Sequence, residues 1–307
     1  MGGRRERAIF WAIAALLVVA TAVAYRLLLG PPPPPPPPPR AEAAPAPVAL
    51  AVSDVSGDVT IVRAGARSRA APGDALRADD AIETAEGARV VLAGADYEVA
   101  LEEGGTFDVR EITAELSRFR LGAGFVSAKV KEESRRAVEI EAAPGERVRT
   151  RGGDVSVARA GETTAVGVAR GSAEFAAGGG TVVLSAGQES IAARGKPPSA
   201  PRKIPESLLL KVTWPEERTT NRRRIVVTGR TQPGAIVVLG SERVDVQADG
   251  RFTHVIALRE GRQRLAARAR GVGGVASDEG PVIVLDTRAP DPRFDTSGLW
   301  AKPKRAR

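Results

Sequence analysis

Short runs of alternating apolar and polar residues, each ended by a glycine-containing turn, fill the middle of this 307-residue chain. Examples are "DVTIVRA", "YEVAL", "TFDVREI", "VEIEA", "DVSVARA" and "TVVLSAG", separated by turn sequences such as "SGD", "PGD", "EEGG" and "RGGD". Alternation with a period of two is typical of strands with one buried face. The pattern from about Val52 to Arg194 therefore predicts many short strands in a β-roll, a solenoid or a sandwich. Residues 112–121, "ITAELSRFRL", are the one ambiguous stretch.

The pattern in 208–290 predicts about seven further strands with turns at regular spacing, which is typical of an immunoglobulin-like sandwich. Pro233-Gly234 and Asp249-Gly250 are turn dipeptides, because proline presets φ and glycine accepts a positive φ. Aromatic residues make up only 4% of the chain, so the cores have to be built mainly from Val, Ala, Ile and Leu. We predict an all-β protein with one N-terminal transmembrane helix.

The N-terminus, "MGGRRERAIFWAIAALLVVATAVAYRLLLG", places three arginines before an apolar segment. Residues 8–29 number 22 and would extend roughly 33 Å as a helix, which spans a bilayer core of roughly 30 Å. The arginines before the span keep residues 1–7 in the cytoplasm by the positive-inside rule. This predicts a single-pass inner-membrane protein with most of its chain in the periplasm.

A signal peptide is the alternative reading of the same segment. Ala22-Val23-Ala24 resembles a cleavage site, so cleavage after Ala24 is the competing expectation. The length of the apolar run and its resumption at Leu27 favour an uncleaved anchor. In both cases the rest of the chain is exported.

Proline-rich segments divide the remainder of the chain. A run of nine prolines lies within residues 30–50, and in polyproline II geometry it extends about 28 Å. We interpret this run as a stiff spacer, with a ligand for a proline-binding domain as the alternative. The expected order is then a β domain at 51–195, a linker at 196–207, the sandwich at 208–290 and a basic disordered tail at 291–307. The tail either frays or docks on an anionic surface.

Several classes of chemistry are excluded by the residue types. The chain has no cysteine and a single histidine, His254, in the strand-like run "GRFTHVIAL". Disulfides, thiol nucleophiles and Cys-based metal centres are therefore impossible. No phosphate-binding loop or nucleophile elbow is present. Carboxylate pairs remain, but few aromatic residues accompany them, so we expect no enzyme, no catalytic or cofactor-binding residues, and no cofactor.

The net charge is +8, and basic proteins often bind nucleic acid. The basic residues are interleaved with acids and lack an accompanying set of aromatic stacking residues. The densest clusters are Arg4, Arg5 and Arg7; Arg222, Arg223 and Arg224; and Lys302, Lys304, Arg305 and Arg307. We therefore predict no nucleic-acid partner.

A cluster of acids lies in "APGDALRADDAIET", residues 71–84, which contains Asp74, Asp79, Asp80 and Glu83. Clustered carboxylates ligate Ca²⁺ or cap turns by accepting backbone N–H bonds. The EF-hand pattern is absent, so we favour the structural role and predict no metal site.

The same stretch carries a resemblance. "SGDVTIVRAG", "APGDALRADDAIET" and "GARVVL" resemble the opening of a FecR-type periplasmic domain, and "RLGAGFVSAKV", "VEIEAAPGERVRTRGGDVSVA" and "VVLSAGQES" resemble its second half. The positions that match the family's turn-and-strand motif are Gly73, Leu76, Asp79, Asp80, Ile82 and Thr84. Asp79 departs from the family's usual glycine. Arg151-Gly152-Gly153 stands where the family often has Arg-Gly-Thr. The resemblance implies a FecR-like β domain over 51–195.

The region 208–290 is similar to bacterial Ig-like extracellular modules, which host many roles. The matching residues are Val227, Gly229, Thr231, Pro233, Gly234, Ala235 and Val237, then Val246, Asp249, Gly250 and Phe252, then Asp286, Thr287, Ala289 and Pro290.

Together these patterns predict a non-enzymatic envelope protein that binds or scaffolds envelope proteins or peptidoglycan and other polysaccharide, with exposed strand edges as candidate contact faces. The alternative is a FecR-type transmembrane regulator, because FecR proteins pass a signal to a cytoplasmic sigma factor. Residues 1–7 are too few to fold or to bury a standard interface, so we expect no direct sigma-factor control. The oligomeric state is not predicted.

Overall fold

A computed structural model of the protein describes residues 3–28 and 50–288. The chain divides into two units, Met1–Pro47 and Val48–Arg307. In the first, α1 (Gly3–Leu28) is a single helix. Its segment Ile9–Leu27 is 19 residues long and apolar enough to cross a membrane by length and composition. The proposed span at 8–29 lies almost wholly in this helix, although residue 29 falls outside the described part of the chain.

The second unit begins with two large sheets, which share strands. The A sheet has the order β4 (Ala75–Leu76), β1 (Leu50–Ser56), β6 (Arg89–Ala93), β7 (Tyr97–Leu101), β9 (Leu116–Val130), β12 (Gly153–Ala160), β13 (Thr163–Ala177), β15 (Gln188–Ala193) and β16 (Arg202–Lys203). The B sheet has the order β3 (Ala66–Arg69), β2 (Val59–Arg63), β5 (Ala81–Thr84), β8 (Thr106–Ile112), β9, β10 (Ala137–Ala143), β11 (Glu146–Thr150), β13 and β14 (Gly180–Ser185). We call residues 50–203 the β module.

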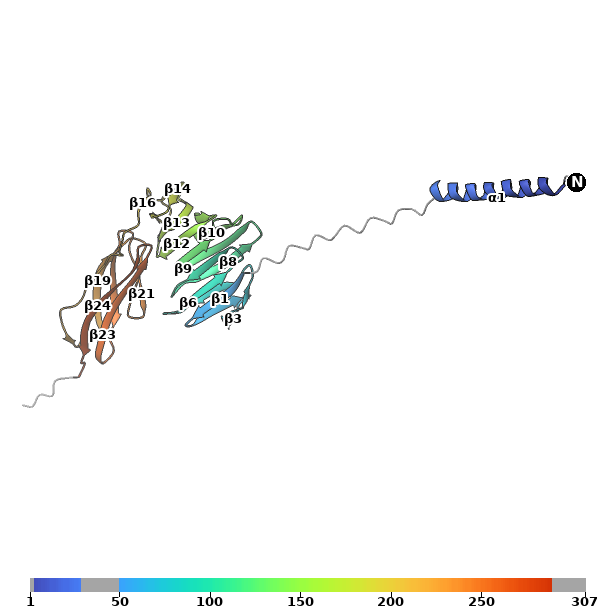
Figure 1. Ribbon diagram of the computed structural model, residues 1–307. Coiled ribbons are helices and arrows are strands. Elements are labelled where there is room, and N and C mark those ends of the chain that lie inside the picture. The colour runs from blue at the N-terminus through green and yellow to red at the C-terminus, as the bar shows by residue number, and fades with distance from the viewer. Residues whose placement is uncertain (1–2, 29–49, 289–307) are drawn as a thin grey trace, which may run out of the picture. The chain divides into compact units, whose positions relative to one another are not determined.

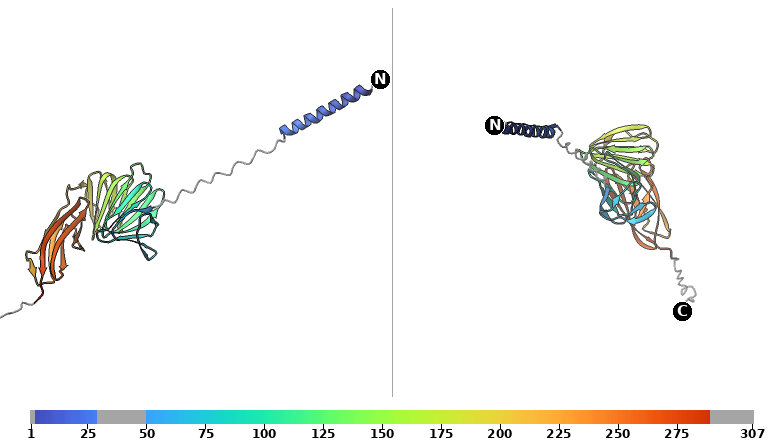
Figure 2. Two further views of the ribbon diagram at one scale, coloured as in Figure 1. Left: turned by 60° about the horizontal axis from the view of Figure 1, so that its bottom comes forward. Right: turned by 90° about the vertical axis from the view of Figure 1, so that its right-hand side faces the viewer.

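Strands β9 and β13, each 15 residues long, belong to both sheets. The first half of β9 pairs with β8 and β10, and its second half pairs with β7 and β12. In β13 the first half pairs with β12 and β15 and the second half with β14. Figures 1 and 2 show the resulting stack of strands, which follows chain order from blue to green. Strands that cross between sheets turn the corner of a sandwich.

The crossing in β13 depends on two glycines that face each other. Gly153 and Gly171 are register partners, and their φ values are +103° and +74°. A Cβ on Gly153 would lie 2.1 Å from the Arg170 carbonyl oxygen, and a Cβ on Gly171 would lie 2.5 Å from the Gly152 carbonyl oxygen. Only glycine fits both the left-handed backbone and the close approach.

One continuous hydrophobic core lies between the A and B sheets. Its largest side chains include Phe107 and Phe119, which stack with their ring centroids 5.0 Å apart, and the fully buried Phe175. The remainder is mostly Val, Leu, Ile and Ala, as the shortage of aromatic residues predicts. Burial of such side chains removes apolar surface from water and is the main stabilising term.

Eight further strands follow in residues 208–288 of the described chain, which we call the sandwich module. One sheet has the order β17 (Leu210–Thr213), β19 (Arg224–Thr231) and β22 (Arg251–Ala257). The other has the order β18 (Thr219–Thr220), β24 (Gly274–Leu285), β23 (Gly261–Gly271), β20 (Ile236–Leu239) and β21 (Glu242–Val244). Their core includes Val227, Val237 and Phe252. The predicted all-β architecture with one N-terminal helix is thus confirmed.

The segment expected as a linker, 196–207, is tied to the β module. It contributes β16, which pairs with β15, and the Ser199 N–H donates to the Ile191 carbonyl at 2.8 Å. The A sheet therefore continues past residue 195. The ambiguous stretch 112–121 holds the end of β8 and the beginning of β9. The proline-rich segment, except its last residue Leu50 in β1, and the basic tail lie outside the described residues.

A buried carboxylate joins the β module to the sandwich module. Glu189 on β15 is fully buried and accepts hydrogen bonds from Gln232 Nε2 at 2.9 Å on both of its oxygens. Arg202 Nε donates to the same carboxylate at 2.9 Å. A second contact is the ion pair between Arg270 Nη2 and Glu102 Oε2, 3.5 Å apart. A buried charge is tolerated only when it is paired and hydrogen-bonded in this way.

Candidate functional site

The four acids of residues 71–84 occupy different environments and do not converge. Asp74 caps a turn by accepting the Ala71 N–H at 2.8 Å. Glu83 lies on β5 and pairs with Arg67. Asp79 is 86% exposed, and Asp80 is 2% exposed. Among the described residues no group of three or more His, Cys, Asp or Glu is placed to hold a metal ion.

Asp80 connects its own loop, residues 77–80, to β2 through hydrogen bonds. Arg63 donates from Nε to Asp80 Oδ1 at 2.8 Å and from Nη2 to Oδ2 at 2.7 Å. The Arg77 N–H donates to Oδ2 at 2.8 Å. These bonds to the charged form, above all the one from Arg63, lower the pKa of Asp80 from its ordinary 3.8.

This pKa shift predicts how stability depends on pH. Because the pKa of Asp80 is lower in the folded than in the unfolded chain, its ionised carboxylate stabilises the fold at pH values above the unfolded pKa. That contribution is lost as the pH falls through the folded pKa. Water reaches Arg63, so we expect Asp80→Asn to cost about 1–2 kcal/mol at pH 7. The gap between wild type and Asp80→Asn in urea unfolding should close as pH falls below 3.8. A gap that stays constant down to pH 2 would contradict the assignment.

Asp79 adopts φ +70°, a left-handed conformation that glycine accepts without strain. This conformation accounts for the glycine that the FecR resemblance expects at this position.

We therefore predict that Asp79→Gly stabilises the protein by about 0.5 kcal/mol, because relief of strain exceeds the entropy lost by glycine. Asp79→Ala should instead destabilise it, since alanine keeps the strain and accepts the left-handed conformation less readily than aspartate does. The nearest cation, Arg110 Nη1, is 3.9 Å away at an exposed position and contributes little. Urea midpoints of the two variants check the sign, and a stabilising Asp79→Ala would contradict it.

Outward side chains of the β module form rows of alternating charge across the strands. One row runs through Glu111, Arg118, Glu139, Arg149 and Glu174 on β8, β9, β10, β11 and β13. A second runs through Asp108, Arg120, Glu141 and Arg147. Arg118 contacts both of its neighbours, at 3.1 Å to Glu111 and 2.8 Å to Glu139. Opposite charges directly across strands stabilise a sheet. We call these the alternating rows.

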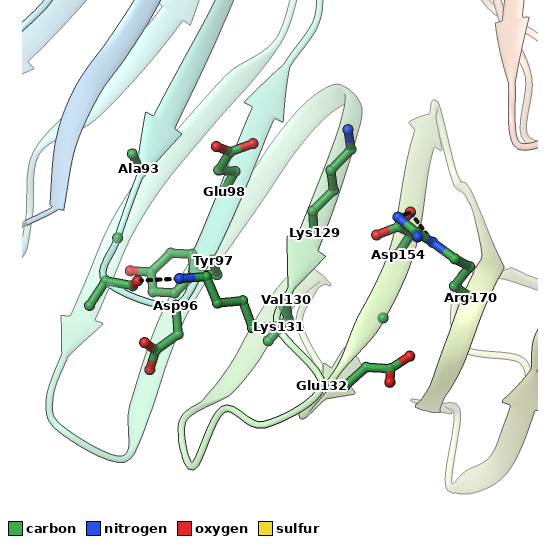
Figure 3. Close-up of a pocket in the computed structure, with 13 residues that line it drawn as sticks. Ala93, Asp96, Tyr97, Glu98, Lys129, Val130, Lys131, Glu132, Asp154 and Arg170 are labelled. Carbon is green, nitrogen blue, oxygen red and sulfur yellow. Dashed lines mark hydrogen bonds and ion pairs between the residues drawn. The ribbon is translucent and has the colours of Figure 1, made fainter.

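A third alternating row lies on the A sheet, through Glu98, Lys129, Asp154 and Arg170. These residues line a shallow cavity of about 430 Å³ near the ends of the central strands β7, β9 and β12, together with Asp96 and Lys131 (Figure 3). Asp154 accepts from Arg170 Nη2 at 2.7 Å. The cavity thus offers charges of both signs to a polar partner.

Tyr97 lies beneath this cavity and does not supply acid–base chemistry near neutral pH. Burial raises the pKa of its phenol, so the group stays neutral. The buried carboxylates Glu139 and Glu146 have partners: Arg118 bonds to Glu139 at 2.8 Å, and Thr164 Oγ1 donates to Glu146 at 2.6 Å. His254 on β22 places Nε2 2.8 Å from Glu242 Oε2.

Strand edges offer a different kind of contact. Strands β3 and β14 at the B-sheet ends, and β17 and β22 at the ends of the three-stranded sheet, each have one strand neighbour in the described structure. β3 carries two exposed arginines in four residues, a composition that discourages strand addition. β14 exposes Val183 and is the more receptive edge.

Comparison with known proteins finds low structural similarity to solved structures and no match in sequence. No family model matches the sequence, and no curated protein matches it. Two crystal structures of a proposed anti-sigma factor from Parabacteroides distasonis align with 16% identity and a TM-score of 0.35, over 40% of this chain and 59% of that chain. A polysaccharide lyase aligns with 9% identity and a TM-score of 0.20, over 79% of this chain and 40% of the lyase. This chain therefore spans less than two thirds of either protein.

Proposed function

We propose that the protein is a membrane-anchored, non-catalytic binding protein of the cell envelope, with its β and sandwich modules on the periplasmic side. The observation that carries the proposal is a helix, Ile9–Leu27, long and apolar enough to cross a membrane, which precedes an all-β body in the chain. Arg4, Arg5 and Arg7 before the span favour a cytoplasmic N-terminus. The binding partners are envelope proteins or cell-wall polysaccharide.

The hydrogen bonds made by the buried acids support the proposal that the protein is not catalytic. The acids buried in the described chain, Asp80, Glu139, Glu146 and Glu189, each bind an Arg, Thr or Gln side chain. A general acid or base needs a group free to exchange a proton with a substrate. The acids of the alternating rows are register partners of cations on neighbouring strands.

In-cell crosslinking of the tagged full-length chain tests the proposal. We expect envelope proteins or cell-wall fragments among the crosslinked species, and fewer of them when the strand edge β14 carries Val183→Lys, which blocks strand addition. Leu209→Lys, at another exposed apolar position, is the matched control. Recovery of neither envelope protein nor glycan would count against a binding role.

The second candidate is a FecR-type transmembrane regulator. The motif geometry favours it: Leu76, Ile82 and Thr84 are buried in or beside short strands, and Asp79 has the positive φ that suits the family's glycine. Crosslinking of the N-terminal segment to a sigma factor would support this candidate over the scaffold role.

A further inference from the structure

Three cations stand in one line across the three-stranded sheet of the sandwich module. Lys211 on β17 is the register partner of Arg230 on β19, and Arg230 is the partner of Arg251 on β22. All three side chains are exposed. Neighbouring strands lie about 4.8 Å apart, so the three charges project from adjacent points of one face. We call Lys211, Arg230 and Arg251 the cation row.

The cation row breaks the pattern of the alternating rows. Like charges directly opposite each other destabilise a sheet. Within the described chain, Arg251 has one partner, Asp249, at 3.4 Å, and neither Lys211 nor Arg230 lies within ion-pair distance of an acid. The row therefore carries uncompensated positive charge where the β module places acids between its arginines.

The surroundings of the row match a polymer more closely than a small anion. Thr213, Thr228 and Thr253 form the next row on the same face, in direct register. Their hydroxyls donate and accept hydrogen bonds. Beyond them lie the exposed pair Val226 and Val255, then Arg224. The face is an open sheet surface, so an extended ligand can contact several rows together.

The charge distribution over the two modules also favours an anionic ligand on the sandwich module. Residues 208–288 contain 14 basic and nine acidic residues, whereas residues 50–207 contain 21 basic and 24 acidic residues. The sandwich module is thus net positive by five, and residues 50–207, which hold the β module, are net negative by three. An anionic ligand would be drawn to the sandwich module.

We propose that the cation row and the threonine row bind an extended anionic polysaccharide, with the cations pairing its carboxylate or phosphate groups and the threonines contacting its hydroxyls. Outward positions of these three strands carry no aromatic side chain on which nucleic-acid bases could stack. The apolar content of these outward positions is one valine pair and Ala257, too little to anchor the face in a lipid surface. This inference uses the proposed location in the cell envelope only to identify the cell envelope as the source of the polysaccharide.

The test uses the full-length protein reconstituted in phosphatidylcholine vesicles, with polygalacturonate as the probe and dextran as the neutral control. We expect binding to polygalacturonate that weakens with added salt, and no binding to dextran. An excess of phosphatidylglycerol vesicles should not displace the polymer. Equal binding to dextran, no binding at low salt, or displacement by the anionic vesicles would overturn the proposal.

Charge-removing variants locate the site. The triple variant Lys211→Gln, Arg230→Gln, Arg251→Gln should bind roughly a hundredfold more weakly, at about fivefold per charge near an anionic surface. The control variant Arg120→Gln, Arg147→Gln, Arg149→Gln removes the same charge from the alternating rows and should keep wild-type affinity. Equal loss in both variants would show nonspecific attraction and contradict the site.

Ligand-free stability gives an independent readout. Removing the repulsion should raise the Tm of the cation-row variant by about 2 °C, while the control variant should not gain. Should the triple variant fail to fold, Arg230→Gln alone removes the central charge and is expected to weaken binding about fivefold. A cytoplasmic location would contradict the proposed function and leave this binding result standing, so the two failures are distinguishable.

Discussion

Replacing Gly153 with alanine should prevent residues 50–203 from reaching their native fold. The new Cβ would lie 2.1 Å from the Arg170 carbonyl oxygen and 2.8 Å from the Gly171 Cα, both of them backbone atoms of β13. The φ of +103° adds strain for any residue other than glycine. Because β12 pairs with both β9 and β13, a shift there disturbs both strands that cross between the sheets. We expect a loss of roughly 4 kcal/mol or more.

The control for this variant is Gly73→Ala. Gly73 also has a positive φ, +95°, but a Cβ there would meet nothing within 4 Å. It should lose only about 1 kcal/mol, the cost of the backbone conformation. Urea unfolding of the full-length variants, followed by far-UV circular dichroism, measures both. Similar midpoints for the two variants would show that close approach at the β13 crossing is unimportant.

Replacing Glu189 with alanine should destabilise the protein by about 3 kcal/mol. The change removes a fully buried carboxylate and leaves the Gln232 amide, 9% exposed, without its acceptor. Arg202 loses its partner as well, though half of that side chain remains in water. We also expect wild type to unfold in one transition and the variant in two, because this carboxylate connects the β module to the sandwich module.

Glu206→Ala is the matched control, since the Glu206 side chain is 92% exposed and pairs with Lys203 only at 3.8 Å. It should stay within about 0.5 kcal/mol of wild type. Calorimetry shows both the size of the loss and the number of transitions. A Glu189→Ala variant as stable as Glu206→Ala would mean that the buried network adds nothing to the junction.

Local features of the fold were predictable from the sequence. The run "YEVAL" became β7 (Tyr97–Leu101), because strand alternation and glycine turns are properties of neighbouring residues. Asp79 stood out as the residue in place of an expected glycine, and its positive φ supplies the physical reason.

Features that depend on register were not predictable. The interleaved charges looked evenly dispersed along the chain, yet pairing sorts them into alternating rows and one cation row. Lys211, Arg230 and Arg251 are separated by about twenty residues each and become neighbours only through β17, β19 and β22. The crossing of β13 at Gly171 and the bond from Gln232 to Glu189 likewise join distant segments, which periodicity cannot reveal.

Accessibility of a single introduced thiol tests most directly whether the body of the protein faces the periplasm, because the chain has no cysteine of its own. Ser241→Cys lies in an exposed turn of the sandwich module, Gly3→Cys lies at the N-terminal end of α1, and Val157→Cys is a fully buried control. In cells with a permeabilised outer membrane, a membrane-impermeant maleimide should label Ser241→Cys at once. It should label Gly3→Cys only after the inner membrane is disrupted, and Val157→Cys only after unfolding. Protection of Ser241→Cys until the inner membrane is disrupted would contradict the account.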